Sequence, residues 1–318
     1  MSQKISPQNP PSPSPGNHHR ALADVLKSRL IFVTGKGGTG KSAVSQAIAR
    51  HLATQAEVLG SGTKKILWVT FEDPTLPPNG LETIAQGKFY QLQRLNIDSM
   101  ASFEEYIGLK LGLPALAGLF VGNKVIRYLA KAAPGLHEMV LLGKLWHERN
   151  HYDQIVADMP SSGYTVTMIQ STQNFSKLFS GGPLSKDATA MIETFLDPVW
   201  TSFLIVSLSE EMPLVESLEL SDQLRKILPG TQPGLLVNRI YPALKNLEAS
   251  LGDPASWESP FAKDAKDFLE KKRILDQVNL RTWQGRQYSK LPYVDPSQGI
   301  AEVSKSLAQE IQSQVATP

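Results

Sequence analysis

The sequence predicts an α/β protein built on a doubly wound, mostly parallel sheet. Two observations lead to this fold class: short runs of apolar residues rich in β-branched side chains, and helical stretches that alternate with them. The runs are apolar at consecutive positions, whereas a strand with one face in water alternates between apolar and polar residues. Strands buried on both faces occur in parallel sheets that helices cover on both sides, so the pattern indicates an open α/β sheet.

The expected elements follow in chain order. A helix is expected at 21–27 and a first strand at 30–34 (LIFVT), followed by a helix at 41–53. Further apolar runs predict strands at 66–70, 154–158, 201–208 and 234–237, a last strand at 288–294 and a closing helix at 298–314.

One interval departs from this alternation of strands and helices. Between about residues 97 and 149 the sequence shows helical periodicity, with Gly and Pro punctuation and no convincing strand. We interpret residues 98–149 as a helical insertion into a single domain of residues 21–318. Residues 1–20 are rich in Pro and Ser and contain almost nothing to bury, so we expect a disordered tail there.

Composition narrows the classes of function. The chain has 318 residues, with 32 Lys and Arg against 30 Asp and Glu, and its net charge of +2 argues against a dedicated nucleic-acid binder. It has no cysteine, which excludes disulfides, Cys-ligated zinc, iron–sulfur clusters and thiolate nucleophiles. No stretch approaches the ~20 apolar residues of a membrane span, and the start of the chain lacks the apolar core of a signal peptide. We therefore expect a cytoplasmic protein without stable membrane insertion.

The strongest motif follows the first expected strand. Residues 35–42 (GKGGTGKS) match the G-x-x-x-x-G-K-[ST] phosphate loop and open the first long helix. Glycines let backbone N–H groups turn inward, and the helix N-terminus adds positive potential for phosphate. Lys41 is expected to reach the β- and γ-phosphates of ATP, and the Ser42 hydroxyl is expected to ligate Mg²⁺. The expected nucleotide-binding residues of this segment are Gly35, Gly37, Gly38, Thr39, Gly40, Lys41, Ser42 and Ala43.

Lys36 adds a second lysine to the loop. The resulting K-G-G-x-G-K-S resembles the deviant Walker A motif of the MinD, ParA and ArsA class. This resemblance implies that Lys36 reaches across a dimer interface to the partner's nucleotide. The alternative is a solvated loop lysine.

Two further segments resemble the switches of ArsA-like ATPases, the anion-transporting and tail-anchored-protein-targeting branch. Residues 71–74 (FEDP) are similar to its switch I, which implies that Asp73 orients the attacking water; Thr75 and Leu76 follow where the family has Ala-His. Residues 158–165 (DMPSSGYT) are similar to its switch II, which implies that Asp158 holds Mg²⁺ and that Ser162 and Gly163 sense the γ-phosphate. Tyr164 replaces the usual His. A plain turn or cap role is the alternative for either aspartate.

A third segment, residues 237–239 (VNR), ends an expected strand as the family's Val-Asn-Gln/Arg does. This implies that Asn238 reads the adenine edge, with Arg239 beside it; a turn role for Asn238 is the alternative. The resemblance covers roughly residues 28–313.

A competing motif lies at 147–151 (HERNH), a literal H-E-x-x-H. On a continuous helix His147 and His151 would share a face and bind zinc, with Glu148 as general base. However, Tyr152 and an expected strand follow at once, so we expect the helix to end here and the two histidines to be solvated at its terminus.

The resemblance implies an ATP-binding and ATP-hydrolysing dimeric switch, as a homodimer or as a heterodimer with an ArsA-like paralogue. Arsenite pumping in the family depends on cysteines, which this chain lacks. Residues 111–122 are apolar or small and uncharged, so a nucleotide-dependent groove for a hydrophobic protein client is one hypothesis, and packing against neighbouring helices or in a dimer is the other. Two further alternatives stay open: a catalytically weak subunit that pairs with an active paralogue, and a ParA- or MinD-like positioning ATPase.

Overall fold

Eight strands form one sheet in the order β3-β4-β2-β5-β1-β6-β7-β8. The computed structural model describes residues 19–60, 62–111, 135–178, 183–241 and 260–316. Neighbouring strands run parallel, except that β3 is antiparallel to β4. The strands are β1 (Leu30–Thr34), β2 (Lys64–Phe71), β3 (Leu81–Gln86), β4 (Tyr90–Ile97), β5 (Gln154–Asp158), β6 (Thr201–Leu208), β7 (Gly234–Ile240) and β8 (Ser289–Pro292).

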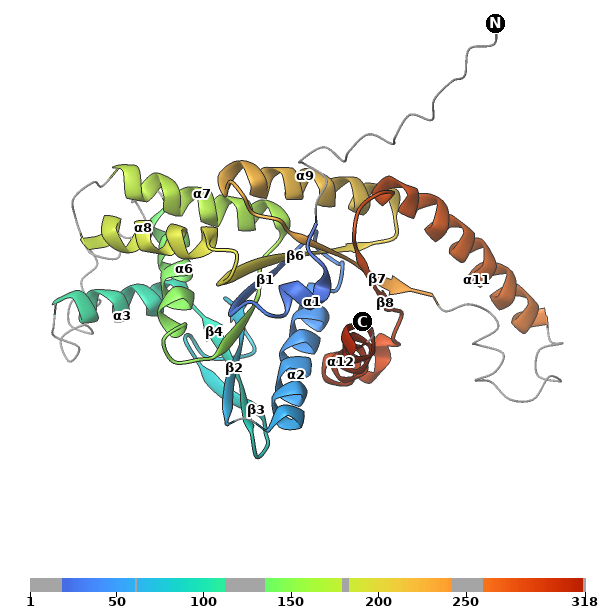
Figure 1. Cartoon of the computed structure of the whole chain (residues 1–318), viewed down its shortest axis with the longest axis horizontal. Helices are drawn as coiled ribbons and strands as arrows, with labels where there is room; N and C mark the ends of the chain where they lie inside the picture. The colour runs from blue at the N-terminus through green and yellow to red at the C-terminus, as the bar shows by residue number, and fades with distance from the viewer. Residues whose placement is uncertain (1–18, 61, 112–134, 179–182, 242–259, 317–318) are drawn as a thin grey trace, which may run out of the picture.

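Helices cover both faces of the sheet (Figure 1). One face carries α1 (Leu22–Val25), α2 (Lys41–Leu59) and α12 (Ile300–Ala316), and α12 packs on α2. The other face carries α6 (Leu136–Glu148), α7 (Ser162–Leu178), α8 (Pro183–Leu196) and α9 (Glu211–Ile227), with α3 (Ser99–Leu111) packed on α6. The helix α11 (Pro260–Asn279) projects at one end, and two short 3₁₀ helices, η3 (Leu280–Trp283) and η4 (Pro296–Gln298), flank β8.

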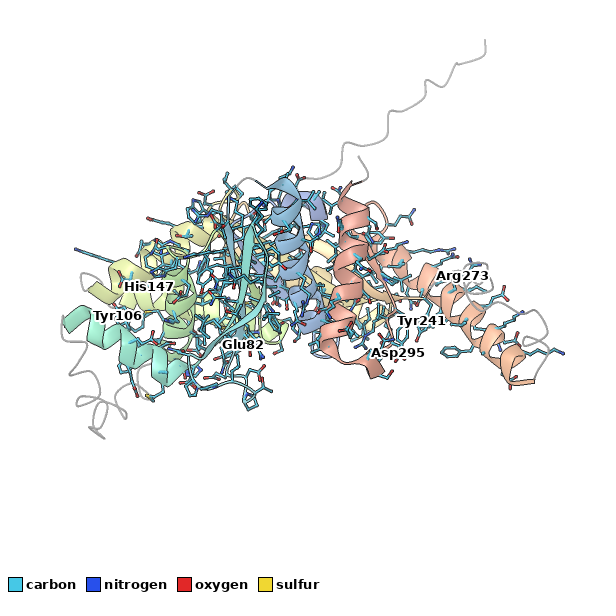
Figure 2. The ribbon with its side chains drawn as sticks, turned by 90° about the horizontal axis from the view of Figure 1, so that it is seen from below. Glu82, Tyr106, His147, Tyr241, Arg273 and Asp295 are labelled. Carbon is cyan, nitrogen blue, oxygen red and sulfur yellow. The ribbon has the colours of Figure 1, made fainter. Side chains whose placement is uncertain are left out.

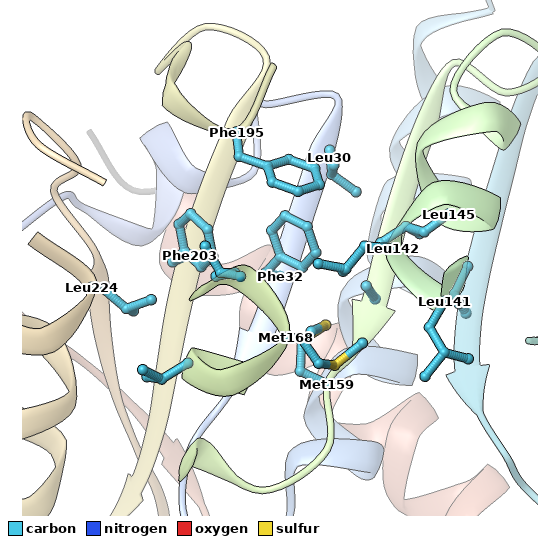
Figure 3. Packing of buried hydrophobic residues seen from close by; sticks show 14 of the residues in the cluster. Leu30, Phe32, Leu141, Leu142, Leu145, Met159, Met168, Phe195, Phe203 and Leu224 are labelled. Carbon is cyan, nitrogen blue, oxygen red and sulfur yellow. The ribbon is translucent and has the colours of Figure 1, made fainter. Parts of the chain in front are cut away.

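Each central strand divides its side chains between two hydrophobic cores. In β1, Leu30 and Phe32 face the core under α6–α9, while Ile31 and Val33 face the core under α2 and α12. Phe32 stacks on Phe203 with ring centroids 4.9 Å apart, at the centre of the first core (Figure 3). Burial on both faces explains why these strands are apolar at every position.

The expected fold class is confirmed, and β1, β5 and β6 have the expected limits. The helix that begins at Lys41 continues to Leu59 rather than ending at 53. The hairpin of β3 and β4 was not expected. It forms one edge of the sheet, and its strands contain charged residues such as Glu82 and Arg94. Its sequence therefore lacks the continuous apolar run that predicts an interior strand.

The described part of the expected insertion consists of the helices α3 and α6. Residues 112–134, which include most of the apolar stretch at 111–122, lie outside the described residues, as do residues 1–18 of the expected tail. His19 and Arg20 belong to the folded body: the Arg20 Nη1 donates to the Ser202 Oγ at 2.6 Å. In the described ranges, no helix has both the length and the apolar character needed to cross a bilayer.

Candidate functional site

The phosphate loop joins β1 to α2 and depends on glycine at two positions. Gly35 (φ 146°) and Gly40 (φ 88°) have backbone conformations that L side chains rarely adopt. A Cβ on Gly35 would collide with the Val206 carbonyl of β6, and a Cβ on Gly40 would collide with the Asn238 amide. These two glycines therefore allow the loop to lie against the carboxyl ends of β6 and β7.

The loop leaves a positively polarised helix end open. The N-cap of α2 is Gly40, which has no side chain to cap the helix, so among the described residues the first backbone N–H groups of α2 are open to an anion. Apart from the adjacent residues in the chain, no atom of the described residues lies within 4 Å of a Cβ built on Gly37 or Gly38. The Lys41 ammonium donates to the Lys36 carbonyl at 3.0 Å, and burial lowers the pKa of Lys41 while the charge of Asp158 opposes that effect. This arrangement fits a polyphosphate.

Asp158 ends β5 beside Ser42. Its Oδ1 is buried and has no hydrogen-bond partner among the described residues, while the neighbouring Ser42 hydroxyl favours the ionised form of the carboxyl group. Burial raises the pKa of Asp158 to about 6, against the lowering effects of Ser42 and Lys41. A buried carboxylate next to a hydroxyl supplies the oxygen ligands that Mg²⁺ prefers. The residues expected to bind Mg²⁺ therefore lie together and fit the ion.

Asp73 lies in the loop that follows β2, and this loop is tightly bound to the sheet. Its Oδ1 accepts from the Thr75 N–H at 2.8 Å and from the Thr75 hydroxyl at 2.7 Å, and its Oδ2 accepts from the Arg94 guanidinium. Burial raises the pKa of Asp73, but the Thr75 hydrogen bonds and Arg94 outweigh it and lower the pKa below its usual value. Asp73 is near enough to Asp158 for its charge to raise the pKa of Asp158. Glu72, which precedes Asp73, has φ 50°.

The expected switch II begins α7 next to the phosphate loop. The Ser162 N–H donates to the Gly35 carbonyl at 3.0 Å, and the Thr34 hydroxyl of β1 donates to the Thr165 hydroxyl at 3.0 Å. Gly163 lies in the first turn of α7 with open space at its Cβ position. Burial, with contributions from Glu138 and Glu72, raises the pKa of Tyr164 to about 12, so this side chain stays neutral.

A cavity of about 420 Å³ adjoins the loop. Asn238 and Arg239 line it together with the loop, which supports their expected place beside the nucleotide. The Asn238 Nδ2 donates to the Thr39 carbonyl at 3.0 Å, so this amide also braces the loop. The remaining wall, which the sequence did not predict, comes from the C-terminal part of the chain: Val294, Pro296, Ile300, Val303 and Leu307. The expected last strand could have indicated this wall. Parallel strands present their carboxyl ends at one edge of the sheet, so the residues that follow this strand should lie near the phosphate loop.

Lys36 has a partner in its own chain. Its Nζ lies 2.5 Å from the Glu216 Oε1 on α9, and both side chains are partly exposed. The expected role of Lys36 in a partner's site stays a prediction.

The H-E-x-x-H segment lies at the end of a helix, as expected. The helix α6 ends at Glu148, whose carboxylate forms a salt bridge with the Lys144 ammonium at 3.0 Å. The ring centroids of His147 and His151 are 5.3 Å apart. Within the ranges that the structure describes, no group of three or more His, Cys, Asp or Glu side chains is arranged to hold a metal ion.

No family model matches the chain, but the chain is similar to several known proteins. The chain is 32% identical over 236 residues to the ATPase BagA of Mycobacterium tuberculosis, a match that covers 68% of this chain and 66% of the relative's length. It is 27% identical over 276 residues to a putative arsenical pump-driving ATPase of Halobacterium salinarum, covering 78% of this chain and 40% of that protein. It is 23% identical over 254 residues to the ATPase GET3 of Eremothecium gossypii, covering 64% of this chain and 70% of that protein. Together with the phosphate loop between β1 and α2 and the mostly parallel sheet, these matches show that this chain belongs to the family of ArsA- and GET3-like ATPases.

Proposed function

We propose that this protein binds ATP with Mg²⁺, hydrolyses it, and acts as a nucleotide-dependent dimeric switch. The observation that carries the proposal is the convergence of the uncapped α2 N-terminus, Lys41, Ser42 and the buried Asp158 beside a cavity of about 420 Å³. Each of these features suits a different part of the same ligand, from the phosphates to the nucleoside.

The reaction that fits this arrangement is in-line attack of water on the γ-phosphorus. Lys41 and the backbone N–H groups of the loop neutralise the charge that develops on the phosphoryl oxygens. Ser42 and Asp158 would hold Mg²⁺, which supplies further neutralisation of that charge. Asp73 accepts a hydrogen bond from the attacking water, and the backbone of Ser162 and Gly163 lies beside the phosphate loop to respond to the γ-phosphate.

Calorimetric titration with ATP and Mg²⁺ tests the binding step. Lys41→Ala removes a charge-assisted contact worth roughly 1.5–3 kcal/mol, so affinity falls about 10- to 150-fold. Lys27→Ala is the control, because Lys27 is an exposed lysine that precedes β1, at the end opposite the phosphate loop, and it pairs only with Asp24 among the described residues. Equal affinities for the wild-type protein and Lys41→Ala would contradict the proposal. ATP binding without turnover would instead identify a catalytically weak subunit that needs an active paralogue.

A dimer in which Lys36 acts on the partner's nucleotide is the second part of the proposal. Cations supplied in trans accelerate phosphoryl transfer by ~10³-fold or more. Lys36→Ala is therefore expected to retain ATP binding and to lose most of the turnover. Turnover per subunit that does not depend on concentration in a monomeric preparation would contradict a trans role.

A hydrophobic protein client is the third part, and its support is the uncharged apolar stretch at residues 111–122. A photoreactive group at Leu116 or Phe120 is expected to label a second protein with an ATP analogue bound and not with ADP. Labelling restricted to this chain's own helices in both nucleotide states would remove the support for a client.

A further inference from the structure

Arg94 is a nearly buried cation on β4, and it points at the switch I loop rather than into solvent. Its side chain is only 14% exposed, and its guanidinium carbon lies 5.1 Å from the centre of the Trp68 ring. One nitrogen, Nη2, donates to the Asp73 Oδ2 and to the Thr75 Oγ1 at 3.1 Å. The other, Nη1, donates to the Glu82 Oε1 at 3.3 Å. Glu82 belongs to the edge strand β3 (Figure 2).

The hydrogen bonds that Asp73 makes with the described residues leave one acceptor position open. A carboxylate offers about four lone-pair positions, two on each oxygen. Both positions of Oδ1 are occupied, by the N–H and the hydroxyl of Thr75. Oδ2 accepts from Arg94, so its second lone pair is the remaining place where Asp73 can accept a hydrogen bond from water.

We propose that Arg94 is a positioning residue for ATP hydrolysis, because it aims the Asp73 Oδ2 at the attacking water. The inference rests on the proposed ATPase function and deepens it. Water attacks the γ-phosphorus as the bond to the bridging oxygen breaks; ADP leaves with that electron pair, and the proton of the water passes to the phosphate product. Asp73 orients the water and Arg94 holds Asp73.

The geometry favours this role over simple support of the β3–β4 hairpin. The hairpin has its own backbone pairing from Leu81 with Leu95 to Gln86 with Gln91. Nη1 donates to Glu82 of the hairpin, whereas Nη2 donates to Asp73 and Thr75 in the loop that follows β2. The planar guanidinium fixes the directions of the Nη1 and Nη2 hydrogen bonds relative to each other, whereas a lysine ammonium has no such fixed geometry.

The test compares Arg94→Met and Arg94→Lys with a matched control, Glu82→Gln. The control removes the other carboxylate partner of Arg94 and leaves the Asp73 contact in place. We expect Arg94→Met to lower kcat about 10- to 100-fold, since a small misplacement of a positioning group costs up to ~10²-fold. The dissociation constant of ATP with Mg²⁺ should change less than about threefold, Arg94→Lys should restore part of kcat, and Glu82→Gln should keep it within about twofold.

A second measurement separates positioning from folding and from the proposed function. ADP with aluminium fluoride mimics the transition state, so its affinity should fall in Arg94→Met in parallel with kcat while ATP affinity stays constant. Unchanged kcat and unchanged aluminium fluoride affinity in Arg94→Met would overturn the inference. So would parallel losses of ATP affinity, kcat and thermal stability without rescue by Arg94→Lys, because these indicate structural support. A wild-type protein that binds no ATP would instead overturn the proposed function.

Discussion

Burial shifts the pKa values of two ionisable side chains, Asp158 and His51, in opposite directions. Asp158 is buried with its pKa raised to about 6, so its ionised form is costly until a cation compensates it. His51 on α2 is 4% exposed, and neither ring nitrogen has a hydrogen-bond partner among the described residues. Burial lowers the pKa of His51 from its ordinary value of 6.5, so the neutral ring is the form that fits the fold.

We predict that His51 makes the protein less stable in mild acid. Below pH 6.5 the unfolded chain binds a proton at this residue more readily than the folded chain does, so the free energy of unfolding falls as pH is lowered. The loss is at most ~1.4 kcal/mol per pH unit. Urea unfolding at pH 7, 6 and 5 should show a smaller loss in His51→Leu than in the wild-type protein. The exposed His151→Leu is the control, and a wild-type slope in His51→Leu would contradict the prediction.

At the scale of elements, the Asn96 side chain on β4 anchors the loop that carries Asp73. Asn96 accepts from the Asp73 N–H at 2.9 Å and donates to the carbonyls of Asp73, Leu76 and Pro77 at 2.9–3.3 Å. Asn79 ties the same loop to α3, because it accepts from the Asp98 N–H and its amide donates to Glu105. The loop that carries Asp73 is therefore anchored both to the sheet and to the first helix of the insertion.

We predict that Asn96→Ala loosens this loop. Asn96 is buried, and its loss leaves the Asp73 N–H and three carbonyls without their partner, at a cost of about 1–3 kcal/mol in the free energy of unfolding. Hydrogen exchange at residues 72–80 should accelerate more than exchange in β1. The exposed Asn150→Ala is expected to change neither quantity. Protection of the loop at wild-type levels in Asn96→Ala would show that the amide does not hold it.

At the scale of the whole molecule, the ion pair between Lys36 and Glu216 bears on assembly. It holds the second lysine of the phosphate loop on α9 of its own chain, while the proposed dimer needs this lysine in the partner's site. An exposed ion pair is worth up to about 1 kcal/mol, so the contact opposes assembly only weakly.

We predict that Glu216→Gln strengthens the ATP-dependent dimer by up to about fivefold for each protomer that has to break this ion pair, which corresponds to that energy. Sedimentation in the presence of an ATP analogue measures the dissociation constant of the dimer. Glu219→Gln on the exposed side of α9 is the control for the change in net charge. If both variants dimerise equally, the ion pair does not compete with assembly.

The sequence by itself determined the central sheet and the residues at its carboxyl edge. β1, β5 and β6 are buried on both faces, and such strands can be built only from continuous apolar runs, which are visible without the structure. The phosphate loop and Asp158 lie at the carboxyl ends of those runs, so their place at one edge of the sheet followed from the parallel direction of the strands, whereas the pairing of β1 with β5 is known only from the structure. Local sequence sufficed because each of these residues is placed by its own strand.

Only the tertiary structure decided which distant residues complete the site. Arg94 reaches Asp73 because β4 pairs with β2, and Glu216 reaches Lys36 because α9 follows β6, the neighbour of β1. The cavity wall at Val294 and Ile300 depends on β8 pairing with β7. The polar positions of an edge strand make its sequence resemble that of a loop. The sequence around a charged surface residue does not indicate which residue it will pair with. These contacts are set by packing between segments far apart in the chain, and no local pattern encodes that packing.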